Sequence, residues 1–444
     1  MGHDELETDT IHTGDAFDVL PELPDESIHA VVTDPPYGLA FMGRSWDDFE
    51  PKEYQEWSER WAREVKRVLK PGGHLLAFSG NRTHHRLFTG VEDAGFEIRD
   101  TLTWHYGSGF PKASDVSKTI DKRADAEREV VGEKTAPDGV PLADRVSHSG
   151  EEYDEESPDY ADCKRDVYER APATDAARKW DGWKTGLKPA TEFIVMARKP
   201  FSGATVDSVL EHGTGALNID ACRVGLSDED DPNQTATRDE SRSGELYVGG
   251  DDGTEHGDEV TTSVTDEGRY PANVVFDETA ADALDREVGE LDVSAGGYTE
   301  EHQSNNRTHE WSNQNDWNDA ERLEDADWYE DTGGPSRYFY TSKASRSERT
   351  NDGAIQNDHP TVKPIDLMEW LIKLVTREGQ IVLDPFAGSG TTCMAAKGLG
   401  RRFIGIERQA KYADVARVRC GLTPDDPSSV RADDVVGLEA FADD

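Results

Sequence analysis

The residues in this chain that are best suited to chemistry form a short acidic turn, Asp34-Pro35-Pro36-Tyr37. Its two prolines fix the backbone angle φ and remove two N–H donors, so the turn is stiff and its carbonyl oxygens have no local donors. A carboxylate, free carbonyls and an aromatic ring together suit an exocyclic amino group of a nucleobase, whose lone pair is delocalised into the ring. A plain Pro-Pro turn with a solvated acid is the alternative interpretation.

On the chemical interpretation, the Asp34 carboxylate and the Pro35 carbonyl each accept one N–H of the amino group and return electron density to its nitrogen. The Tyr37 ring stacks on a base that has left the double helix, because a paired amino group is inaccessible. Direct transfer of a methyl group would then depend on positioning and on electrostatic support of the developing positive charge. Asp34 is thus interpreted as a hydrogen-bond acceptor rather than as a strong base.

A glycine-rich turn at residues 384–390, Asp-Pro-Phe-Ala-Gly-Ser-Gly, marks a second candidate site far along the chain. Its glycines let a ligand approach the backbone, and the helix expected after it offers free N–H donors. Glu407 lies 17 residues after Gly390, at the expected tip of the next strand, where an acid suits ribose hydroxyls. A dinucleotide or nucleotide site would look similar.

Two observations narrow the ligand of this glycine-rich turn. The chain has neither the GxGxxG pattern of pyrophosphate sites nor the GK[ST] pattern of triphosphate sites there. Asp384, placed before the loop, would repel a phosphate but would suit a ligand that carries an ammonium and a sulfonium. S-adenosylmethionine carries both, and it is the cofactor that we expect.

Apolar periodicity predicts the elements that position the acidic turn. Residues 28–33 form a buried strand that runs directly into it, and residues 54–69 form an amphipathic helix. The segment Lys70-Pro-Gly-Gly73 stops this helix, because proline and glycine cannot continue a helix cheaply. Further along, we expect a strand at 74–78, a helix at 84–94 and a strand at 97–106.

The glycine-rich turn lies in a second ordered region. A strand at 380–383 enters the turn, a helix follows at 391–399, and a strand at 402–406 ends at Glu407. Strand, glycine turn, helix and strand make a βαβ unit, so a mainly parallel sheet is expected. The other expected elements are helices at 365–376 and 411–419 and strand-like segments at 191–197 and 270–276.

Composition limits the setting of this protein. Its 92 acidic and 48 basic residues give a formal net charge of −44, which would normally oppose binding to DNA. Molar salt shortens the Debye length to about 3 Å and removes that objection, so we interpret the acidity as a halophilic adaptation. An acidic protein with disordered tails is the alternative. The polar stretches 130–178, 225–267 and 295–334 are typical of solvated loops or disordered insertions.

Cysteine usage and hydropathy predict a reducing cytoplasm. The four cysteines, at 163, 222, 393 and 420, form no CxxC pair, so neither a zinc site nor a disulfide framework is expected. No apolar run approaches the roughly 20 residues of a membrane span. The acidic, polar segment 1–10 is unlike a signal peptide.

Together these motifs resemble the N4-cytosine/N6-adenine DNA methyltransferases of the β motif order, in which the catalytic half precedes the cofactor half. Gly14-Asp15 looks like the family motif whose acid contacts the cofactor's adenine, and residues 359–364, His-Pro-Thr-Val-Lys-Pro, look like the motif beside its methionine moiety. Leu69–Gly73 and Arg402–Glu407 also look like family segments. Segments that resemble phage and prophage members are Gly109–Lys112, Leu187–Ala190, Ala197–Pro200, Gly213–Asp220, Arg269–Asn273 and Tyr340–Ala344.

The resemblance implies the fold and the domains. It implies an α/β S-adenosylmethionine-dependent methyltransferase fold: a mainly parallel seven-stranded sheet with helices on both faces and an inserted target-recognition region. We expect a catalytic half at 8–110, a target-recognition region with acidic insertions at 111–345, a cofactor half at 346–420 and an acidic tail at 421–444. The predicted catalytic residues are Asp34, Pro35, Pro36 and Tyr37; the cofactor contacts are Asp15, Thr361, Lys363, Asp384, Phe386, Gly388, Ser389, Gly390 and Glu407; no metal site is predicted.

The resemblance also predicts the partner, double-stranded DNA with a short recognition sequence. It leaves a cognate restriction endonuclease and a homodimer open. Trp104, Tyr106, Trp180 and Trp183 could stack or wedge during base flipping, although core packing suits Trp104 better. The candidate phosphate contacts are Lys112, Lys118, Lys122, Arg123, Lys179, Lys184, Lys188, Arg198 and Lys199.

The base and two rival functions stay open. An aspartate at position 34 favours adenine N6, because N4-cytosine members often carry serine there. Cytosine N4 is the alternative, because such enzymes with this tetrapeptide occur in archaea and the composition suggests a halophilic archaeon. A protein-glutamine methyltransferase would carry Asn-Pro-Pro-Tyr after its cofactor loop, and a non-catalytic nucleic-acid-binding module would not need both turns intact.

Overall fold

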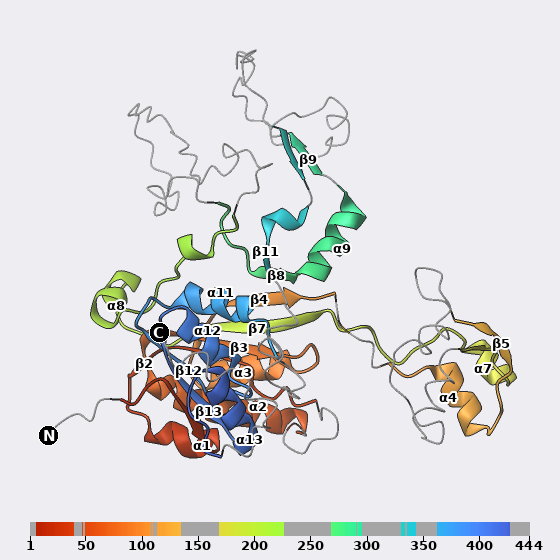
Figure 1. Cartoon of the computed structure of the whole chain (residues 1–444), viewed down its shortest axis with the longest axis horizontal. Coiled ribbons are helices and arrows are strands. Elements are labelled where there is room, and N and C mark those ends of the chain that lie inside the picture. Colours follow the sequence, from red (N-terminus) through yellow and green to blue (C-terminus); the bar gives the residue numbers. More distant parts are fainter. Residues whose placement is uncertain are drawn as a thin grey trace, which may run out of the picture. The chain divides into compact units, whose positions relative to one another are not determined.

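The computed structural model describes residues 6–39, 47, 49–107, 109, 113–134, 168–225, 268–289, 291–294, 330–333, 335–342 and 362–426 (Figure 1). The chain divides into two compact units: residues 1–108 together with 190–444, and residues 109–189. Each unit is described by itself below.

A single large sheet organises the first unit. Its nine strands follow the order β1-β13-β12-β2-β3-β7-β4-β8-β11, and all neighbours run parallel except β7, which is antiparallel to both β3 and β4. This confirms the mainly parallel sheet but gives nine strands against the seven expected: β1 and β11 were not predicted, whereas β8 overlaps the strand-like segment expected at 270–276. The strands are β1 (Thr10–Thr13), β2 (Ile28–Thr33), β3 (Leu69–Ser79), β4 (Glu97–His105), β7 (Thr191–Arg198), β8 (Val274–Asp277), β11 (Tyr340–Ser342), β12 (Ile381–Asp384) and β13 (Arg402–Glu407).

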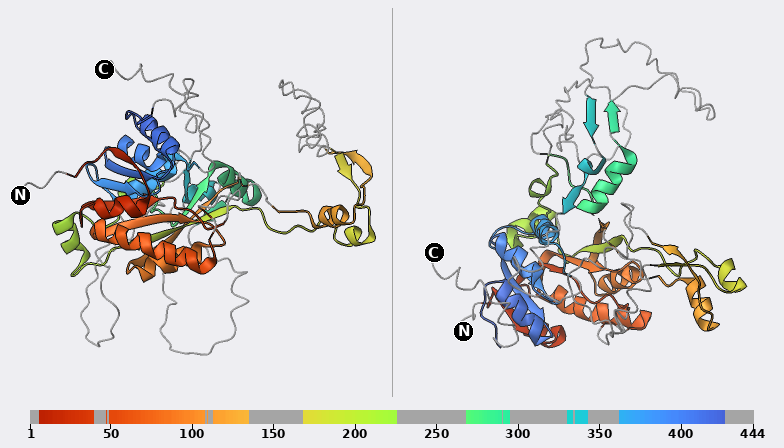
Figure 2. Two further views of the ribbon diagram at one scale, coloured as in Figure 1. Left: turned by 90° about the horizontal axis from the view of Figure 1, so that it is seen from below. Right: turned by 45° about the vertical axis from the view of Figure 1, so that its right-hand side comes forward.

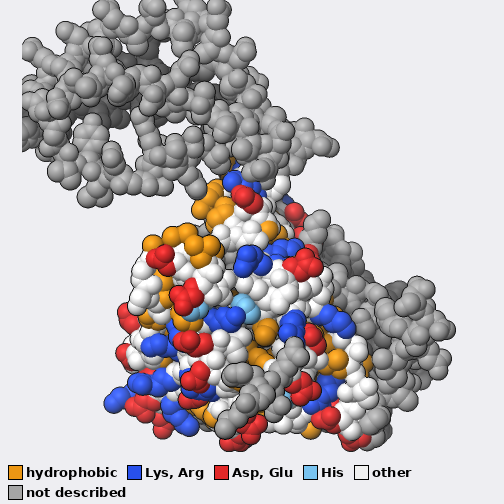
Figure 3. All heavy atoms as spheres, turned by 90° about the vertical axis from the view of Figure 1, so that its left-hand side faces the viewer, with side chains coloured by type: hydrophobic (Ala, Val, Ile, Leu, Met, Phe, Trp, Pro, Cys, Tyr) orange, Lys and Arg blue, Asp and Glu red, His pale blue; other side chains and the backbone are white. Residues whose placement is uncertain are grey.

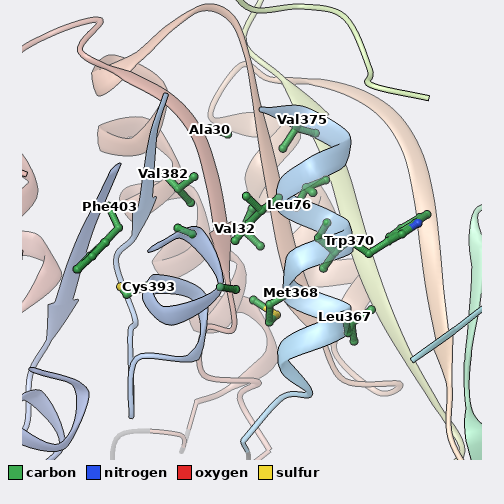
Figure 4. Close-up of a cluster of buried hydrophobic side chains, with 14 of the residues drawn as sticks. Ala30, Val32, Leu76, Leu367, Met368, Trp370, Val375, Val382, Cys393 and Phe403 are labelled. Atoms are coloured by element: carbon green, nitrogen blue, oxygen red, sulfur yellow. The ribbon is translucent and has the colours of Figure 1, made fainter. Parts of the chain in front are cut away.

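Helices cover both faces of this sheet, as predicted. The strand β2 is buried on both sides, with Ala30 and Val32 in one hydrophobic cluster and Val31 in the other. Figure 4 shows Leu367 and Met368 of α11 beside the strands that form the first cluster. The principal helices are α1 (Ala16–Val19), α2 (Pro51–Val68), α3 (His84–Asp93), α8 (Thr205–His212), α9 (Glu278–Val288), α11 (Ile365–Val375), α12 (Thr391–Gly398) and α13 (Ala410–Arg419).

The segment Lys70-Pro-Gly-Gly73 behaves differently from the prediction in one respect. Helix α2 ends before it, at Val68, but the segment is not a free turn: strand β3 begins at Leu69 and includes it. The pairing with β2 is irregular there, and Gly72 adopts a φ of +76°. The same residues therefore end the helix and bend the start of the strand.

The two sequence regions that carry the candidate turns lie side by side. Strand β1 pairs in parallel with β13, with Thr13 opposite Glu407, and Figures 1 and 2 show the red N-terminal and blue C-terminal segments as neighbours. Residues 421–426 continue beyond the predicted cofactor half and also pack on it, since Asp425 forms an ion pair with Arg417 at 2.8 Å. The remainder of the predicted tail lies outside the described residues.

The predicted target-recognition region, 111–345, is not one module. Its later part supplies β7, β8 and β11 to the large sheet, because the apolar residues of 191–197 are buried between β3 and β4. A short antiparallel pair, β9 (Leu291–Ser294) with β10 (Glu330–Gly333), also belongs to the first unit. Only residues 109–189 form the separate second unit.

The second unit is small and is held together by a buried acid. It contains α4 (Val116–Arg123), α7 (Asp175–Lys179) and the antiparallel pair of β5 (Val130–Glu133) and β6 (Tyr168–Arg170). Asp121 accepts hydrogen bonds from the Thr174 hydroxyl at 2.7 Å and from the Arg128 guanidinium at 2.7 Å. Although desolvation opposes ionisation, these bonds lower the pKa of Asp121 to about 2.

The described surface and interior add three observations. On the face in Figure 3, acidic and basic side chains are interspersed over the described surface. Cys222, Cys393 and Cys420 are free and buried, whereas Cys163 lies outside the described residues. Within the described part of the chain, no helix combines the length and apolar character that crossing a membrane requires.

Candidate active site

The acidic turn and the glycine-rich turn follow neighbouring strands. Strands β2 and β12 are paired in parallel, and the turns leave their carboxyl ends. The Thr33 hydroxyl, at the end of β2, donates to Asp384 Oδ1 at 2.6 Å across 351 positions of sequence. Carboxyl ends of parallel strands are where open α/β sheets bind ligands, so both turns lie at one functional edge.

Asp34, in the acidic turn, accepts hydrogen bonds from two side chains. Its Oδ1 accepts the Tyr37 hydroxyl at 2.7 Å, and its Oδ2 accepts the Lys363 ammonium at 2.6 Å. Lys363 comes from just before α11, and its side chain is 7% exposed, against 20% for Asp34. Lys363, predicted as a cofactor contact, therefore has its ammonium on the acid of the predicted catalytic turn.

Glu192 completes this group and was not predicted. Its Oε2 lies 2.8 Å from the Tyr37 hydroxyl and 3.3 Å from Lys363 Nζ. Strand β7 is antiparallel, so its first residues meet the ends of β3 and β4: Phe193 pairs with Ser79. The available signal was an acid at the start of an otherwise apolar strand, but its partners follow only from the antiparallel pairing.

Burial and charge act together on these side chains. Burial alone would lower the pKa of Lys363, but the adjacent Asp34 and Glu192 raise it above its usual value, so the ammonium stays charged. Burial, followed by the charges of the same two acids, raises the pKa of Tyr37 well above its usual value. The Tyr37 hydroxyl therefore keeps its single proton, and it faces two carboxylates.

The backbone of the acidic turn leaves one acceptor free. The Tyr54 hydroxyl of α2 donates to the Pro36 carbonyl at 2.8 Å. Asp47 accepts hydrogen bonds from two backbone N–H groups that follow the turn, at 2.6 and 3.1 Å. Among the described residues, none donates to the Pro35 carbonyl. The acceptor that the sequence predicted for a substrate N–H is thus held in a fixed turn without a protein donor.

Glu407 joins the glycine-rich turn to β13. Its Oε2 accepts the Gly388 N–H at 2.9 Å, and its Oε1 accepts the Gln409 N–H at 2.8 Å. Burial raises the pKa of Glu407 to about 7. Gly390 has a φ of +83°, and an added Cβ would lie 2.8 Å from Ala416, so this position requires glycine.

Asp384 is more enclosed than the prediction implied. It is 3% exposed, and besides Thr33 it accepts the Thr392 hydroxyl at 2.6 Å and the Phe386 N–H at 3.1 Å. Burial raises its pKa to about 6. These contacts tie the glycine-rich turn to α12 and β2, and a direct contact of Asp384 with a cofactor stays a prediction.

The remaining predicted cofactor contacts differ in their surroundings. Asp15 caps α1 by accepting the Phe17 N–H at 3.0 Å, and the preceding N–H of Gly14 donates to the Glu407 carbonyl at 3.0 Å. The Phe386 ring packs against Trp57 and Trp61 of α2. Ser389 accepts hydrogen bonds from Arg419 and is 3% exposed. Thr361 lies outside the described residues.

Several predicted phosphate contacts have protein partners instead. Arg198 donates to Glu97 at 2.8 Å, and Lys199 donates to the Leu69 carbonyl at 2.7 Å, so both support the far end of β7. In the second unit, Lys184 donates to Asp115 at 2.6 Å. Lys112 lies outside the described residues.

The predicted aromatic contacts separate into two groups. Trp104 packs against the hydrophobic core, in line with its expected role. Trp180 and Trp183, in the second unit, are 45% and 59% exposed and form an edge-to-face pair with centroids 5.0 Å apart. The exposed pair is the better candidate for contact with a nucleic acid.

The chain is similar to several characterised proteins. The DNA methylase family matches residues 28–418. Type II methyltransferase M.HindIII of Haemophilus influenzae is 24% identical over 452 residues, which cover 93% of this chain and 96% of the relative. Type II methyltransferase M2.DpnII of Streptococcus pneumoniae is 56% identical over 61 residues, 14% of this chain and 23% of the relative.

The chain also matches solved structures. PvuII DNA methyltransferase (cytosine-N4-specific) is 15% identical with a TM-score of 0.41, and the match covers 93% of this chain and 86% of the other. The M1.HpyAVI–SAM complex is 16% identical with a TM-score of 0.37, and the match covers 93% of this chain and 99% of the other.

Proposed function

This chain belongs to the DNA methylase family and is an S-adenosylmethionine-dependent DNA methyltransferase, and we propose that Asp34, Pro35, Pro36 and Tyr37 form its catalytic turn. The glycine-rich turn and Glu407 hold the cofactor. The observation that carries this proposal is the hydrogen bond between Thr33 and Asp384, which joins the two turns at adjacent strand ends.

The residues present fit such a cofactor. Glu407 is a nearly buried acid at a strand end, where a carboxylate can accept the two ribose hydroxyls. The N-terminus of α12 offers backbone N–H groups to the cofactor's carboxylate. Asp15, beside Glu407 through β1, is proposed to face the adenine. When bound, the cofactor supplies a methyl group on a positively charged sulfur.

The chain's own residues position and polarise the target amino group. Asp34 and the free Pro35 carbonyl each accept one N–H, which returns electron density to the nitrogen. With the cofactor bound, the amino nitrogen would take up the methyl carbon, and the electron pair of the broken carbon–sulfur bond would stay on sulfur. Asp34 stabilises the positive charge that develops on nitrogen and then accepts the released proton or passes it to solvent.

We propose adenine N6 as the target, because the first residue of the turn is an aspartate. Cytosine N4 is the second candidate, since the net charge of −44 supports a halophilic host, in which we expect cytosine-N4 enzymes with this tetrapeptide. M.HindIII and M2.DpnII are named as Type II methyltransferases, which supports placing this chain in a restriction–modification system.

The target base is tested by methylating duplex DNA with the purified chain and S-adenosylmethionine, digesting it to nucleosides and measuring these by mass spectrometry. N6-methyladenine is expected. N4-methylcytosine alone would overturn the adenine assignment and leave the enzyme class intact. Neither product, across DNA of varied sequence, would contradict the proposed catalytic turn. A reaction without cofactor is the control.

The second unit, residues 109–189, is proposed to bind the DNA as part of the predicted target-recognition region. Its exposed Trp180 and Trp183 offer two flat apolar surfaces, and Lys179 lies beside them in sequence. Aromatic faces stack on unpaired bases, and cations contact phosphates without regard to sequence. Within the unit, the hydrogen bonds of Asp121 to Ala173 and Thr174 support the start of α7, the helix that leads into Trp180.

A further inference from the structure

Glu192 is an acid beside the catalytic turn that the mechanism above does not use. Its side chain is 18% exposed, and its Oε2 contacts both Lys363 and the Tyr37 hydroxyl. Burying a charged carboxylate costs free energy unless it is paired, so the position of Glu192 calls for a functional explanation. The network around Asp34 supplies one.

The charges of this network do not cancel. Asp34 and Glu192 contribute two negative charges, and Lys363, within 2.6 and 3.3 Å of them, contributes one positive charge. The group therefore carries a net charge of about −1. Without Glu192, the ammonium of Lys363 would neutralise Asp34, and an amino group that approached would meet an ion pair instead of an anion.

We propose that Glu192 is a positioning residue for methyl transfer: it takes up the charge of Lys363, so that Asp34 keeps a net negative charge for the target amino group. The proposal rests on the catalytic role of Asp34 proposed above. Partial burial makes this charge effective, because opposite charges interact more strongly where water is excluded.

Glu192 also gives Lys363 an alternative acceptor. The target N–H needs the Asp34 carboxylate, and Lys363 occupies its Oδ2 at 2.6 Å. When the amino group binds there, the ammonium can shift towards Glu192 Oε2, from which it is 3.3 Å away. The Tyr37 hydroxyl lies 2.7 Å from Asp34 Oδ1 and 2.8 Å from Glu192 Oε2, so its one proton can be donated to either acid.

The first test is Glu192→Gln, which keeps the side-chain shape and an acceptor for Tyr37 but removes the charge. At saturating S-adenosylmethionine and DNA, we expect the single-turnover rate of methyl transfer to fall on the order of 10- to 100-fold. The cofactor Kd should stay unchanged. A rate equal to that of the wild-type enzyme would overturn the proposal.

Glu97→Gln is the matched control. Glu97 is a carboxylate on the neighbouring strand β4, and it pairs with Arg198 at the opposite end of β7. Its loss removes the same charge from the same pair of strands without touching Lys363. Methyl transfer by this variant should stay within about twofold of the wild-type rate, since Glu97 lies at the opposite end of β7 from the catalytic turn.

The decisive test restores the charge without restoring the carboxylate. In the double variant Glu192→Gln/Lys363→Met, Asp34 alone again gives a net charge of −1. We expect it to transfer methyl groups about tenfold faster than Glu192→Gln. A double variant no faster than Glu192→Gln would assign the defect to geometry and overturn the proposal.

Two further variants distinguish a failure of the Glu192 proposal from a failure of the proposed role of Asp34. Glu192→Asp keeps the charge on a shorter side chain and should retain more activity than Glu192→Gln; equal loss in both would also assign the effect to geometry. Asp34→Ala reports on the proposed function itself. If it still transferred methyl groups, the catalytic role of Asp34 would fail, whatever the Glu192 variants do.

Discussion

The acids of the catalytic turn and of the glycine-rich turn differ in whether a cation faces them. Asp34 faces a fixed cation, the Lys363 ammonium at 2.6 Å. Asp384 and Glu407 receive only hydroxyl and backbone N–H donors, and among the described residues neither forms an ion pair. Burial accordingly raises the pKa of Asp384 to about 6 and that of Glu407 to about 7.

This difference indicates which of the two sites can accept positive charge from a bound ligand. At the catalytic turn, the balance of charges is set by the chain's own side chains. At the glycine-rich turn, the acids have no counter-ion among the described residues, and on the proposed function a bound ligand with a sulfonium and an ammonium would supply one. The first site is therefore expected to control the rate of transfer, and the second the affinity for cofactor.

The largest expected effect comes from Asp34→Ala. Removal of the acceptor that supports the developing positive charge should lower the single-turnover rate at least about 1,000-fold. The cofactor Kd, measured by calorimetry, should change less than about threefold, because Asp34 does not belong to the glycine-rich turn. A parallel loss of cofactor affinity would contradict the division between the two sites.

Glu407→Gln should show the reverse pattern. The substitution keeps the shape but removes the charge that accepts ribose hydroxyls, and hydrogen bonds to charged groups contribute about 1.5–3 kcal/mol each. We expect the cofactor Kd to rise on the order of 10- to 100-fold, while the rate at saturating cofactor stays within about threefold of wild type. An unchanged Kd would remove Glu407 from the proposed cofactor site.

A change of pH should have a smaller effect, on the stability of the chain and on its affinity for the cofactor. Burial raises the pKa of Glu407 from 4.5 to about 7, so its contribution to stability is fully present below about pH 4.5 and is lost as pH rises through 7. The cofactor favours the ionised form, so affinity should change in the opposite sense. Between pH 6 and 8 we expect the Kd to fall by about tenfold with rising pH, and to level off above about pH 8.

Calorimetry across this range, with Glu407→Gln as the control, checks the pH prediction. The variant cannot titrate at this position, so its Kd should vary less with pH than that of the wild type. The melting temperature of the cofactor-free wild type, relative to the variant, should decrease as pH rises from 5 to 8. Equal pH dependence in both proteins would show that another group is responsible.

The two turns could be predicted from sequence because their chemistry is local. A buried strand followed by Asp34-Pro-Pro, and another followed by the glycine-rich turn, carry their strand ends and their reactive groups in a few consecutive residues. The parallel order then brings them together. The number of strands was underestimated, because β1 and β11, of four and three residues, are too short to stand out in the sequence.

The network around Asp34 could not be predicted in the same way. The long side chain of Lys363 can place its charge in several directions, so its sequence position does not predict its partner. It reaches Asp34 because α11, which follows it, packs over β2. Glu192 belongs to a strand inserted antiparallel between β3 and β4, and no local pattern shows which edge of the sheet it reaches. For the same reason Arg198 looked like a phosphate contact, although Glu97 of β4 holds it.

The insertion of residues 109–189 has a consequence for how this protein can change. The chain leaves the sheet after β4 and returns directly into β7, and these strands are paired at that point, with His105 opposite Thr191 and the Tyr106 N–H bonded to the Ala190 carbonyl at 3.1 Å. Entry and exit are therefore adjacent, so a whole inserted unit can be exchanged without altering the sheet. On the role proposed for this unit, its replacement would change the DNA specificity and leave the catalytic residues of the sheet unaltered.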